Sequence, residues 1–544
     1  MTSASIHSKR ALVVLAGSAA VAVALAGCSP SGTSTGGDGD NVILIGTTDK
    51  VTTLDPAGSY DNGSLTLHTQ VFPYLLNSQY GSPDIEPDIA VSAEFTSPTE
   101  YTVVLKEGLT WANGNDLTAS DVKFTFDRQL SIPEASEAGP ASLLYNLEST
   151  EAVDDTTVVF TLKTENDQVF PQILSSFPGA IVDEEVFSAD SLTSDEDIVA
   201  GNAFAGQYVI DSYDFNQTIS MVPFDGYQGL LGPADNDGVI LSYYADSSNL
   251  KLDVQSGEVD VAFRSLSPTD IEDLRGDDAV KVVDGPGGEI RYMVFNFDTM
   301  AYGAKTAEAD PAKALAVRQA AASLVDRAEI ASQVYKDTYT PLYSFIPDGF
   351  TGATTVLQDL YGDGAGGPDA EAASAILEAA GVTTPVALDL QYSADDHYGP
   401  SSGDEYALVE SQLEASGLFD VSLQSTEWVQ YTVDYRSDVY PVFQLGWFPD
   451  YSDGDNYLTP FFLEGGFFNN HYSNPEVDAL ILQQGVTTDP AERTALIEEI
   501  QAKVAADMPT LPLLQGAQLA VTGTDVSGAV LDASFKFRFA PLTK

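Results

Sequence analysis

The sequence predicts an α/β protein of two or three domains between which the chain crosses more than once. The chain has 544 residues, which is too long for one hydrophobic core. Its residues are 44% hydrophobic and 10% aromatic, so it has enough apolar side chains to fill several cores. Strand-like and helix-like segments interleave over the whole length, and this order favours α/β lobes with chain crossings over independent domains in a row.

Three segments in the first third of the chain have the patterns of β-strands. Residues 41–46 (NVILIG) form a short apolar run that is typical of a buried strand. Residues 100–108 (EYTVVLKEG) and 155–163 (DTTVVFTLK) are rich in β-branched residues. We expect both to be strands in an antiparallel setting.

Helices are predicted mainly from the signals at their ends. Thr118 and Asp121 have the spacing of a capping box, so a helix is expected to start near residue 119. An alanine-rich segment with apolar residues three and four apart predicts a helix over 312–325. Four further helices are indicated by Asp326 with Glu329, by Pro368 with Gly381, by Asn474 and Pro475 with Gly485, and by Asp489 with Glu492 before Pro509.

The N-terminus has the features of an export signal. Two basic residues precede an apolar run over 11–26, which is short for a membrane-spanning helix. Residues 25–28 (LAGC) end at Cys28, the only cysteine of the chain, and resemble the bacterial lipobox. That resemblance implies cleavage after Gly27 and lipidation of Cys28. We therefore expect the protein at the extracytoplasmic face of the cell membrane, anchored by the lipid on Cys28.

This interpretation divides the first forty residues into two parts. Residues 1–27 are the predicted signal peptide. Residues 28–40 follow as a lipid-anchored tether, since all of them after Cys28 are small or polar and none can contribute to a core.

The charge of the chain excludes one class of partner. There are 81 acidic and 23 basic residues, which gives a formal net charge of −58. Such a protein repels phosphate backbones, so no nucleic-acid partner is expected. The acids are spread along the chain and form no single tail, which favours a role in solubility over the attraction of cationic ligands.

Motifs for catalysis and metal binding are missing from the sequence. It contains no G-x-S-x-G, S-x-x-K, H-E-x-x-H or Walker A pattern. The four histidines are far apart, and the acids of residues 450–456 (DYSDGDN) do not match the register of an EF-hand. We expect neither an enzyme nor a metal or other cofactor. An extracellular hydrolase stays an alternative, because so many acids can form a catalytic pair by accident.

Several blocks of the sequence together resemble one family, the extracellular solute-binding proteins of family 5, which serve ABC importers for peptides and nickel. The most recognisable block runs over 87–128 and contains a strand, Lys-x-Gly, an aromatic residue, Gly and Leu-Thr-Ala-x-Asp-Val before a helix that ends in Arg. The other blocks follow in the family's order at 52–76, 256–262, 293–297, 317–330, 446–462 and 470–481. Residues 201–208 depart from the family, which usually has a Gly-x-Gly-Pro-Tyr turn there.

The resemblance implies a two-lobed α/β fold, like that of periplasmic binding proteins, with an extra domain inserted. The ligand is expected in the cleft between the lobes, which close by a hinge motion. The implied division is lobe I over 41–76, 202–286 and 509–544, an additional smaller domain of lobe I over 77–201, and lobe II over 287–508.

The stretch 446–462 (GWFPDYSDGDNYLTPFF) sets carboxylates among aromatic rings, although unpaired carboxylates resist burial. In peptide-binding members of the family, the Gly-Trp-x-x-Asp block supplies the carboxylate that pairs with the peptide's α-amine. The resemblance therefore implies that role for Asp450, with Trp447 attracting or packing the ligand. Asp453 and Asp455 are expected to hold the loop or to face solvent.

Other candidate site residues follow from the same resemblance. Trp428 and Tyr60 lie in blocks that border the family's cleft, whereas Trp111 resembles a packing aromatic of the core. Arg291 and Arg436 are the candidates for pairing with a peptide carboxylate.

The expected function is that of a receptor that captures short peptides and delivers them to an ABC permease and its ATPase subunits. The receptor is expected to be a monomer. Nickel chelates, oligosaccharides and other small solutes stay open as alternative ligands of the same fold.

Overall fold

The computed structural model describes residues 41–136, 139–534 and 536–544, and residues 41–544 form one compact unit. The predicted signal peptide, the tether and the proposed lipidation site Cys28 lie outside these described residues. Within them, the structure contains no helix with both the length and the apolar character needed to span a membrane.

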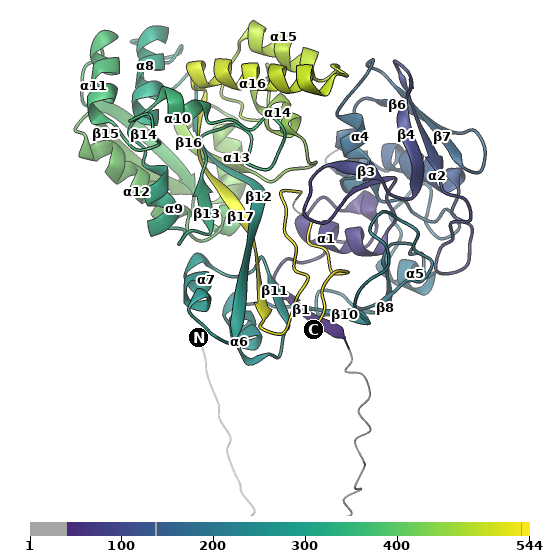
Figure 1. Ribbon diagram of the computed structural model, residues 1–544. Helices are drawn as coiled ribbons and strands as arrows, with labels where there is room; N and C mark the ends of the chain where they lie inside the picture. Colours follow the sequence, from purple (N-terminus) through teal and green to yellow (C-terminus); the bar gives the residue numbers. More distant parts are fainter. Residues whose placement is uncertain (1–40, 137–138, 535) are drawn as a thin grey trace, which may run out of the picture. The chain divides into compact units, whose positions relative to one another are not determined.

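A mixed sheet of eleven strands forms the centre of the fold (Figure 1). The pairing within it is antiparallel except at β14–β15, β14–β16, β1–β10 and β1–β11. Its order is β15 (Phe419–Thr426), β14 (Val386–Ser393), β16 (Val442–Trp447), β12 (Val280–Phe295), β17 (Thr510–Gly523), β11 (Val261–Phe263), β1 (Val42–Thr47), β10 (Gly238–Tyr243), β9 (Thr218–Pro223) and β8 (Tyr208–Asp214), with β13 (Tyr339–Pro341) paired to β17.

Two smaller sheets and a set of helices complete the structure. The small sheets are β4 (Ala90–Ser97), β5 (Glu100–Leu105), β7 (Thr157–Leu162) and β6 (Leu147–Ala152) in that order, and β2 (Leu76–Ser78) with β3 (Ile85–Pro87). The longer helices are α1 (Asn62–Val71), α2 (Ala119–Ser131), α6 (Ser247–Ser256), α7 (Pro268–Arg275), α8 (Pro311–Ala322), α9 (Arg327–Gln333), α11 (Ala370–Ala379), α12 (Ser402–Ala415), α13 (Trp428–Tyr435), α15 (Pro475–Gln484) and α16 (Pro490–Asp507).

The strands β12 and β17 run through the middle of the structure and belong to more than one core (Figure 1). They pair from Val280 with Gly523 to Val294 with Thr510, and the register shifts twice along the way. One end of this ribbon packs in the largest core, formed within 290–533. The other end packs beside β1, β8, β9 and β10, where Ala520 belongs to a second core.

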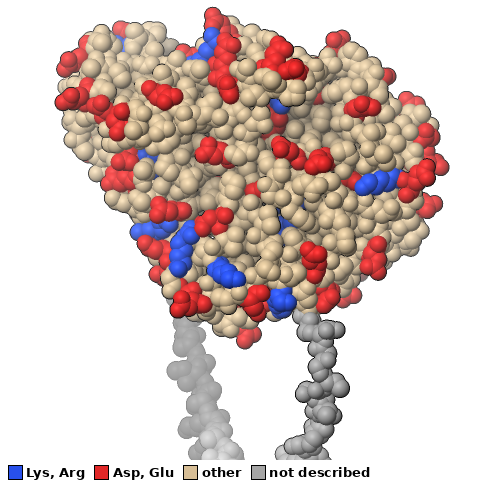
Figure 2. Space-filling model, in the orientation of Figure 1, with Lys and Arg blue, Asp and Glu red and all other residues tan. Residues whose placement is uncertain are grey.

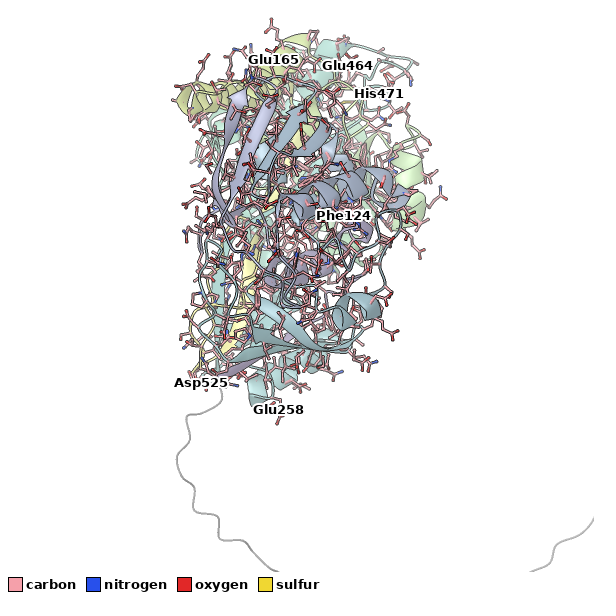
Figure 3. All side chains as sticks on the ribbon, turned by 90° about the vertical axis from the view of Figure 1, so that its right-hand side faces the viewer. Phe124, Glu165, Glu258, Glu464, His471 and Asp525 are labelled. Atoms are coloured by element: carbon pink, nitrogen blue, oxygen red, sulfur yellow. The ribbon has the colours of Figure 1, made fainter. Side chains whose placement is uncertain are left out.

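A third core lies between the four-stranded sheet and α2. Trp111 is 1% exposed there and its Nε1 donates to Asp121 at 3.3 Å, which confirms the prediction that it is a core residue. Tyr451, from much later in the chain, also packs in this core. In Figure 3, Glu165 and Glu464 lie near the same end of the structure, with Glu258 and Asp525 at the opposite end.

Several of the predicted strands and helix ends occur in the structure. Strands occur at 42–47, 100–105 and 157–162, and α2 starts at residue 119 with a complete capping box between Thr118 and Asp121, so these predictions are confirmed. At α9 only half of the predicted capping box forms. Asp326 accepts from the backbone N of Glu329, but its own N–H donates to Gln412.

Candidate functional site

A cavity of about 620 Å³ opens between segments that are far apart in the sequence. That volume lies within the range of small-molecule binding sites. Segments 48–49, 264–268, 289–291, 397–401 and 516–519 line it, together with side chains such as Asn62, Tyr335, Tyr339 and Phe448.

Two arginines in the cavity wall are already neutralised by acids. Arg264, which follows β11, has its Nε 3.4 Å from Asp49 Oδ2 and its guanidinium 5.4 Å from the ring of Phe448. Arg291 of β12 lies 3.4 Å from both Glu289 and Glu405. Its surroundings are therefore rich in acceptors, although it was a candidate partner for a ligand carboxylate.

Three helices begin at this cavity. Ser247 starts α6, Ser267 precedes α7 and Ser401 precedes α12, and all three residues line the wall. Ser401 makes no side-chain capping bond. The N-terminal end of a helix carries partial positive charge and backbone N–H groups without helical partners. Asp246 caps α6 and Ser267 caps α7, so the N-terminal end of α12 is the part of this wall that suits the anionic part of a ligand.

Asp450, two residues after the lining residue Phe448, accepts a hydrogen bond from a distant segment of the chain. Tyr60 Oη donates to Asp450 Oδ1 at 2.6 Å, and the ring of Tyr60 packs edge-on against Phe177. Asn456 Oδ1 accepts from the backbone N of Asp450 at 2.9 Å, which fixes the loop. The second carboxylate oxygen has only a long contact, 3.5 Å from Asn456 Nδ2.

Burial is the main influence on the pKa values of Asp450 and Tyr60. It raises the pKa of Asp450 to about 6, against the lowering effect of the Tyr60 and Asn456 hydrogen bonds. Burial, and then the charge of Asp450, raises the pKa of Tyr60 well above its ordinary value, so the phenol keeps its proton and donates. Among the described residues, no lysine, arginine or histidine forms an ion pair with Asp450.

The two other acids of the stretch hold the loop together. Asp453 forms a bidentate ion pair with Arg493, with N–O distances of 2.8 and 2.7 Å, and caps the short helix Gly454–Tyr457. Asp455 is 2% exposed and accepts from Tyr451 Oη at 3.1 Å and from Gln484. Burial, followed by the charge of Asp453, raises the pKa of Asp455 to about 6.

The predicted aromatic residues occupy two separate places. Trp447 Nε1 donates to the same Asn456 oxygen that holds Asp450, at 2.8 Å, and its ring packs edge-on against Phe461. Trp428 stacks on His397 with ring centroids 3.5 Å apart. The structure therefore brings Trp447, Asp450 and Tyr60 together, and it places Trp428 elsewhere.

None of the four predicted ligand-binding residues lines the cavity itself. Three of them are close to lining residues in the sequence, since Trp447 and Asp450 flank Phe448, and Tyr60 is two residues before Asn62. The fourth, Trp428, stacks on the lining residue His397. Arg436 is exposed at the end of α13 over the ring of Tyr435 and does not line the cavity. Lining residues that the sequence analysis missed, Arg264 and Gln518 among them, stand in no local motif.

One histidine-containing group of possible metal ligands lies away from the cavity. His471, labelled near the top of Figure 3, is 2.5 Å from Asp438 Oδ1 and 3.5 Å from Asp298 Oδ2. Lys305 Nζ is 2.8 and 3.0 Å from the same two carboxylates. An ammonium group therefore already offsets one of the two carboxylate charges of this cluster.

The surface charge agrees with the composition. On the face shown in Figure 2, acidic side chains are scattered over every region, and the fewer lysines and arginines are mostly in its lower part. This distribution resembles that of a solvated acidic protein.

The sequence profile described as bacterial extracellular solute-binding proteins, family 5 Middle, matches residues 84–469, which is more than half of the chain. The chain belongs to this family. The dipeptide-binding protein of Escherichia coli (strain K12) is 23% identical over 503 residues, which cover 88% of this chain and 89% of that protein. The dipeptide-binding protein DppE of Bacillus subtilis (strain 168) is 24% identical and is covered to 90%, as is this chain.

Comparison of structures gives the same family and fold. The crystal structure of the ABC transporter substrate-binding protein CtaP from Listeria monocytogenes has a TM-score of 0.77 and 25% sequence identity. The match covers 93% of this chain and 99% of CtaP. The protein therefore has the two-lobed α/β fold of an extracellular solute-binding protein and is not an enzyme, which sets the hydrolase alternative aside.

Proposed function

We propose that this family 5 protein captures short peptides in the 620 Å³ cavity and delivers them to an ABC import permease and its ATPase subunits. One observation carries the proposal. Asp450 is a largely desolvated carboxylate with one strong hydrogen bond and, within the described chain, no cationic partner. A peptide's α-ammonium supplies the missing charge.

The two ends of a peptide have different places in this proposal. The ammonium pairs with Oδ2 of Asp450, which accepts only the 3.5 Å contact from Asn456 and lies two residues after the lining residue Phe448. The carboxylate end lies toward the N-terminal end of α12, which has no side-chain cap and where the helix dipole favours negative charge. The chain between them fills the cavity.

We also propose the division into lobes implied by the sequence, with lobe I over 41–76, 202–286 and 509–544 and lobe II over 287–508. Tyr60 and Asp450 then belong to different lobes, so their 2.6 Å hydrogen bond is a closure contact. Strand β12 passes from lobe I to lobe II between Pro286 and Gly287, where its register with β17 shifts, and this crossing is the hinge. The smaller domain over 77–201 extends the contact, because the N–H of Gln168 donates to the carbonyl oxygen of Gly485 at 2.9 Å.

The cellular setting of the proposal rests on the N-terminal sequence. Lipidation of Cys28 retains a monomeric receptor at the extracytoplasmic face of the membrane, to which residues 29–40 connect it.

The proposal is tested by denaturing the purified protein and identifying the released small molecules by mass spectrometry. Recovered short peptides support it. Recovery of a nickel chelate or an oligosaccharide without peptides would replace the ligand class while leaving the family intact.

A further inference from the structure

Gln518 is a buried amide without a hydrogen-bonding partner. It lies on β17 opposite Gly285 of β12, is 2% exposed and lines the cavity. Neither its Oε1 nor its Nε2 forms a hydrogen bond with any described residue. Native proteins pair nearly all such groups, so a carboxamide with both atoms unpaired needs a specific explanation.

A second glutamine on the same strand shows what a structural amide looks like here. Gln515 is 3% exposed, and its Nε2 donates to the carbonyl oxygens of Gly287 at 2.8 Å and Asp348 at 3.0 Å. Its Oε1 accepts from the N–H of Asp348 at 2.8 Å. The side chain of Gln515 thus joins β17 to two other segments. The side chain of Gln518, three residues later, forms no such hydrogen bond with the described residues.

We propose that Gln518 binds the main chain of the ligand, accepting from the N–H and donating to the C=O of one residue of an extended peptide. This inference rests on the proposed peptide-binding function and assigns one step of it.

The geometry of an extended peptide fits a carboxamide. The N–H and C=O groups of one residue in an extended chain point to the same side, where a neighbouring strand would pair with both. A glutamine side chain presents one acceptor and one donor in a plane and makes both bonds. Such a contact involves only the main chain of the ligand. Gln518 would therefore favour peptides over other solutes without selecting a peptide sequence.

The inference predicts opposite effects of two matched substitutions in the unliganded protein. Gln518→Met keeps the length of the side chain and removes two unpaired polar atoms, so we expect the melting temperature to stay level or rise. Gln515→Met leaves the groups of Asp348 and Gly287 unpaired, so the melting temperature should fall. A fall of equal size in both variants would mean that Gln518 is a structural amide, and the inference would be wrong.

Binding is tested with a peptic digest of casein, from which the native protein captures peptides that are identified by mass spectrometry. The most enriched peptide is then synthesised and titrated. We expect Gln518→Met to bind it about tenfold more weakly, because two main-chain groups of the peptide lose their partner. Methylation of one particular peptide nitrogen should weaken binding to the native protein and cause little further loss in Gln518→Met.

The outcomes separate this inference from the function on which it rests. Capture of peptides with equal affinity by native protein and Gln518→Met would overturn the role of Gln518 alone. If the native protein captures no peptide from the digest, the proposed function fails and this inference fails with it.

Discussion

Arg128 at the end of α2 and Asp55 before α1 form a bidentate ion pair that is almost completely buried. Both N–O distances are 2.8 Å, and the side chains are 1% and 0% exposed. Asp55 also accepts from the backbone N of Thr193 at 2.7 Å, and Arg128 donates to the carbonyl oxygen of Ser191 at 3.1 Å. The pair therefore ties together three segments that are distant in the sequence.

Arg128→Met should destabilise the protein strongly. The substitution leaves the Asp55 carboxylate buried without its cation, and breaking such a pair costs about 3–5 kcal/mol of unfolding free energy. Urea unfolding followed by circular dichroism measures the loss. Lys123→Met is the control, because Lys123 pairs with Asp127 on the surface of the same helix and should change stability by about 0.5 kcal/mol or less. Equal losses in the two variants would contradict the importance of the buried pair.

Asp450→Asn should weaken peptide binding by about 30-fold to several thousand-fold, since removing one partner of a desolvated charge pair costs roughly 2–5 kcal/mol. N-acetylation of the peptide should weaken binding to the native protein and add little further loss in the variant. Calorimetry of the four combinations measures this coupling. The control is Asp389→Asn, which removes an exposed acid on β14. The nearer acids Asp453 and Asp455 are unsuitable as controls, because their contacts hold the loop and their loss would disturb it. Equal affinity of free and acetylated peptide for the native protein would show that Asp450 does not hold the amine.

The pKa of Asp450 gives the pH dependence of binding. Because the carboxyl group has a pKa of about 6, it is protonated below that pH and cannot pair with an ammonium. Peptide affinity should fall about tenfold per pH unit below 6 in the native protein and stay nearly flat in Asp450→Asn. A native profile parallel to that of the variant would assign the titration to another group.

Stability should change with pH in the opposite sense. The folded-state pKa of Asp450 lies above that of an aspartate in the unfolded chain, about 4. The stability that this group contributes is therefore present below about pH 4 and is lost as the pH rises to 6. At pH 7, Asp450→Asn should therefore be more stable than the native protein by on the order of 2 kcal/mol. Urea unfolding at pH 4 and pH 7 checks that the difference disappears at the lower pH.

Tyr60→Phe removes the hydroxyl group of the proposed closure contact and should shift the unliganded protein toward an open form. X-ray scattering should give a larger radius of gyration for this variant than for the native protein without ligand. Added peptide should reduce the radius in both. Tyr244→Phe is the control, since Tyr244 Oη donates to Asp253 Oδ2 at 2.7 Å and both residues belong to lobe I. An unchanged scattering curve at saturating peptide would count against hinge closure.

Cys28→Ala tests the lipid anchor. The substitution removes the only cysteine, so the protein should either leave the membrane fraction or stay as uncleaved precursor. Fractionation with mass analysis of the N-terminus distinguishes the two. A variant that is matured at the same site and stays membrane-bound after washing would refute the lipoprotein interpretation.

Local signals were sufficient for much of the secondary structure. The capping box of Thr118 and Asp121 is complete because both of its partners lie within one helical turn. Strand β12 could not be predicted in this way, since Pro286, Gly287 and Gly288 interrupt its run of strand-forming residues and are typical of a turn. The strand continues because the register shift after Pro286 absorbs these residues and β17 pairs on both sides of them.

The candidate site was predictable only in part, because its contacts join residues that are far apart in the sequence. The stretch around Asp450 stands out by its mixture of aromatic rings and acids. Its contact with Tyr60 joins residues that no sequence pattern relates. The loop role of Asp453 depends in the same way on Arg493, from another helix. Gln518 looks like any polar residue of a strand until its missing partners are seen in the fold.

Strand β17 is the last strand of the chain, yet it lies at the middle of the central sheet between β12 and β11. A ribosome makes the protein from its N-terminus, so nearly the whole polypeptide is synthesised before residues 510–523 emerge. Until then β12 has no partner along most of one edge, and the cores at both ends of the β12–β17 ribbon are incomplete. Completion of the central sheet therefore waits for the end of synthesis, which suits the predicted export of the protein, because a translocation channel accepts an unfolded chain.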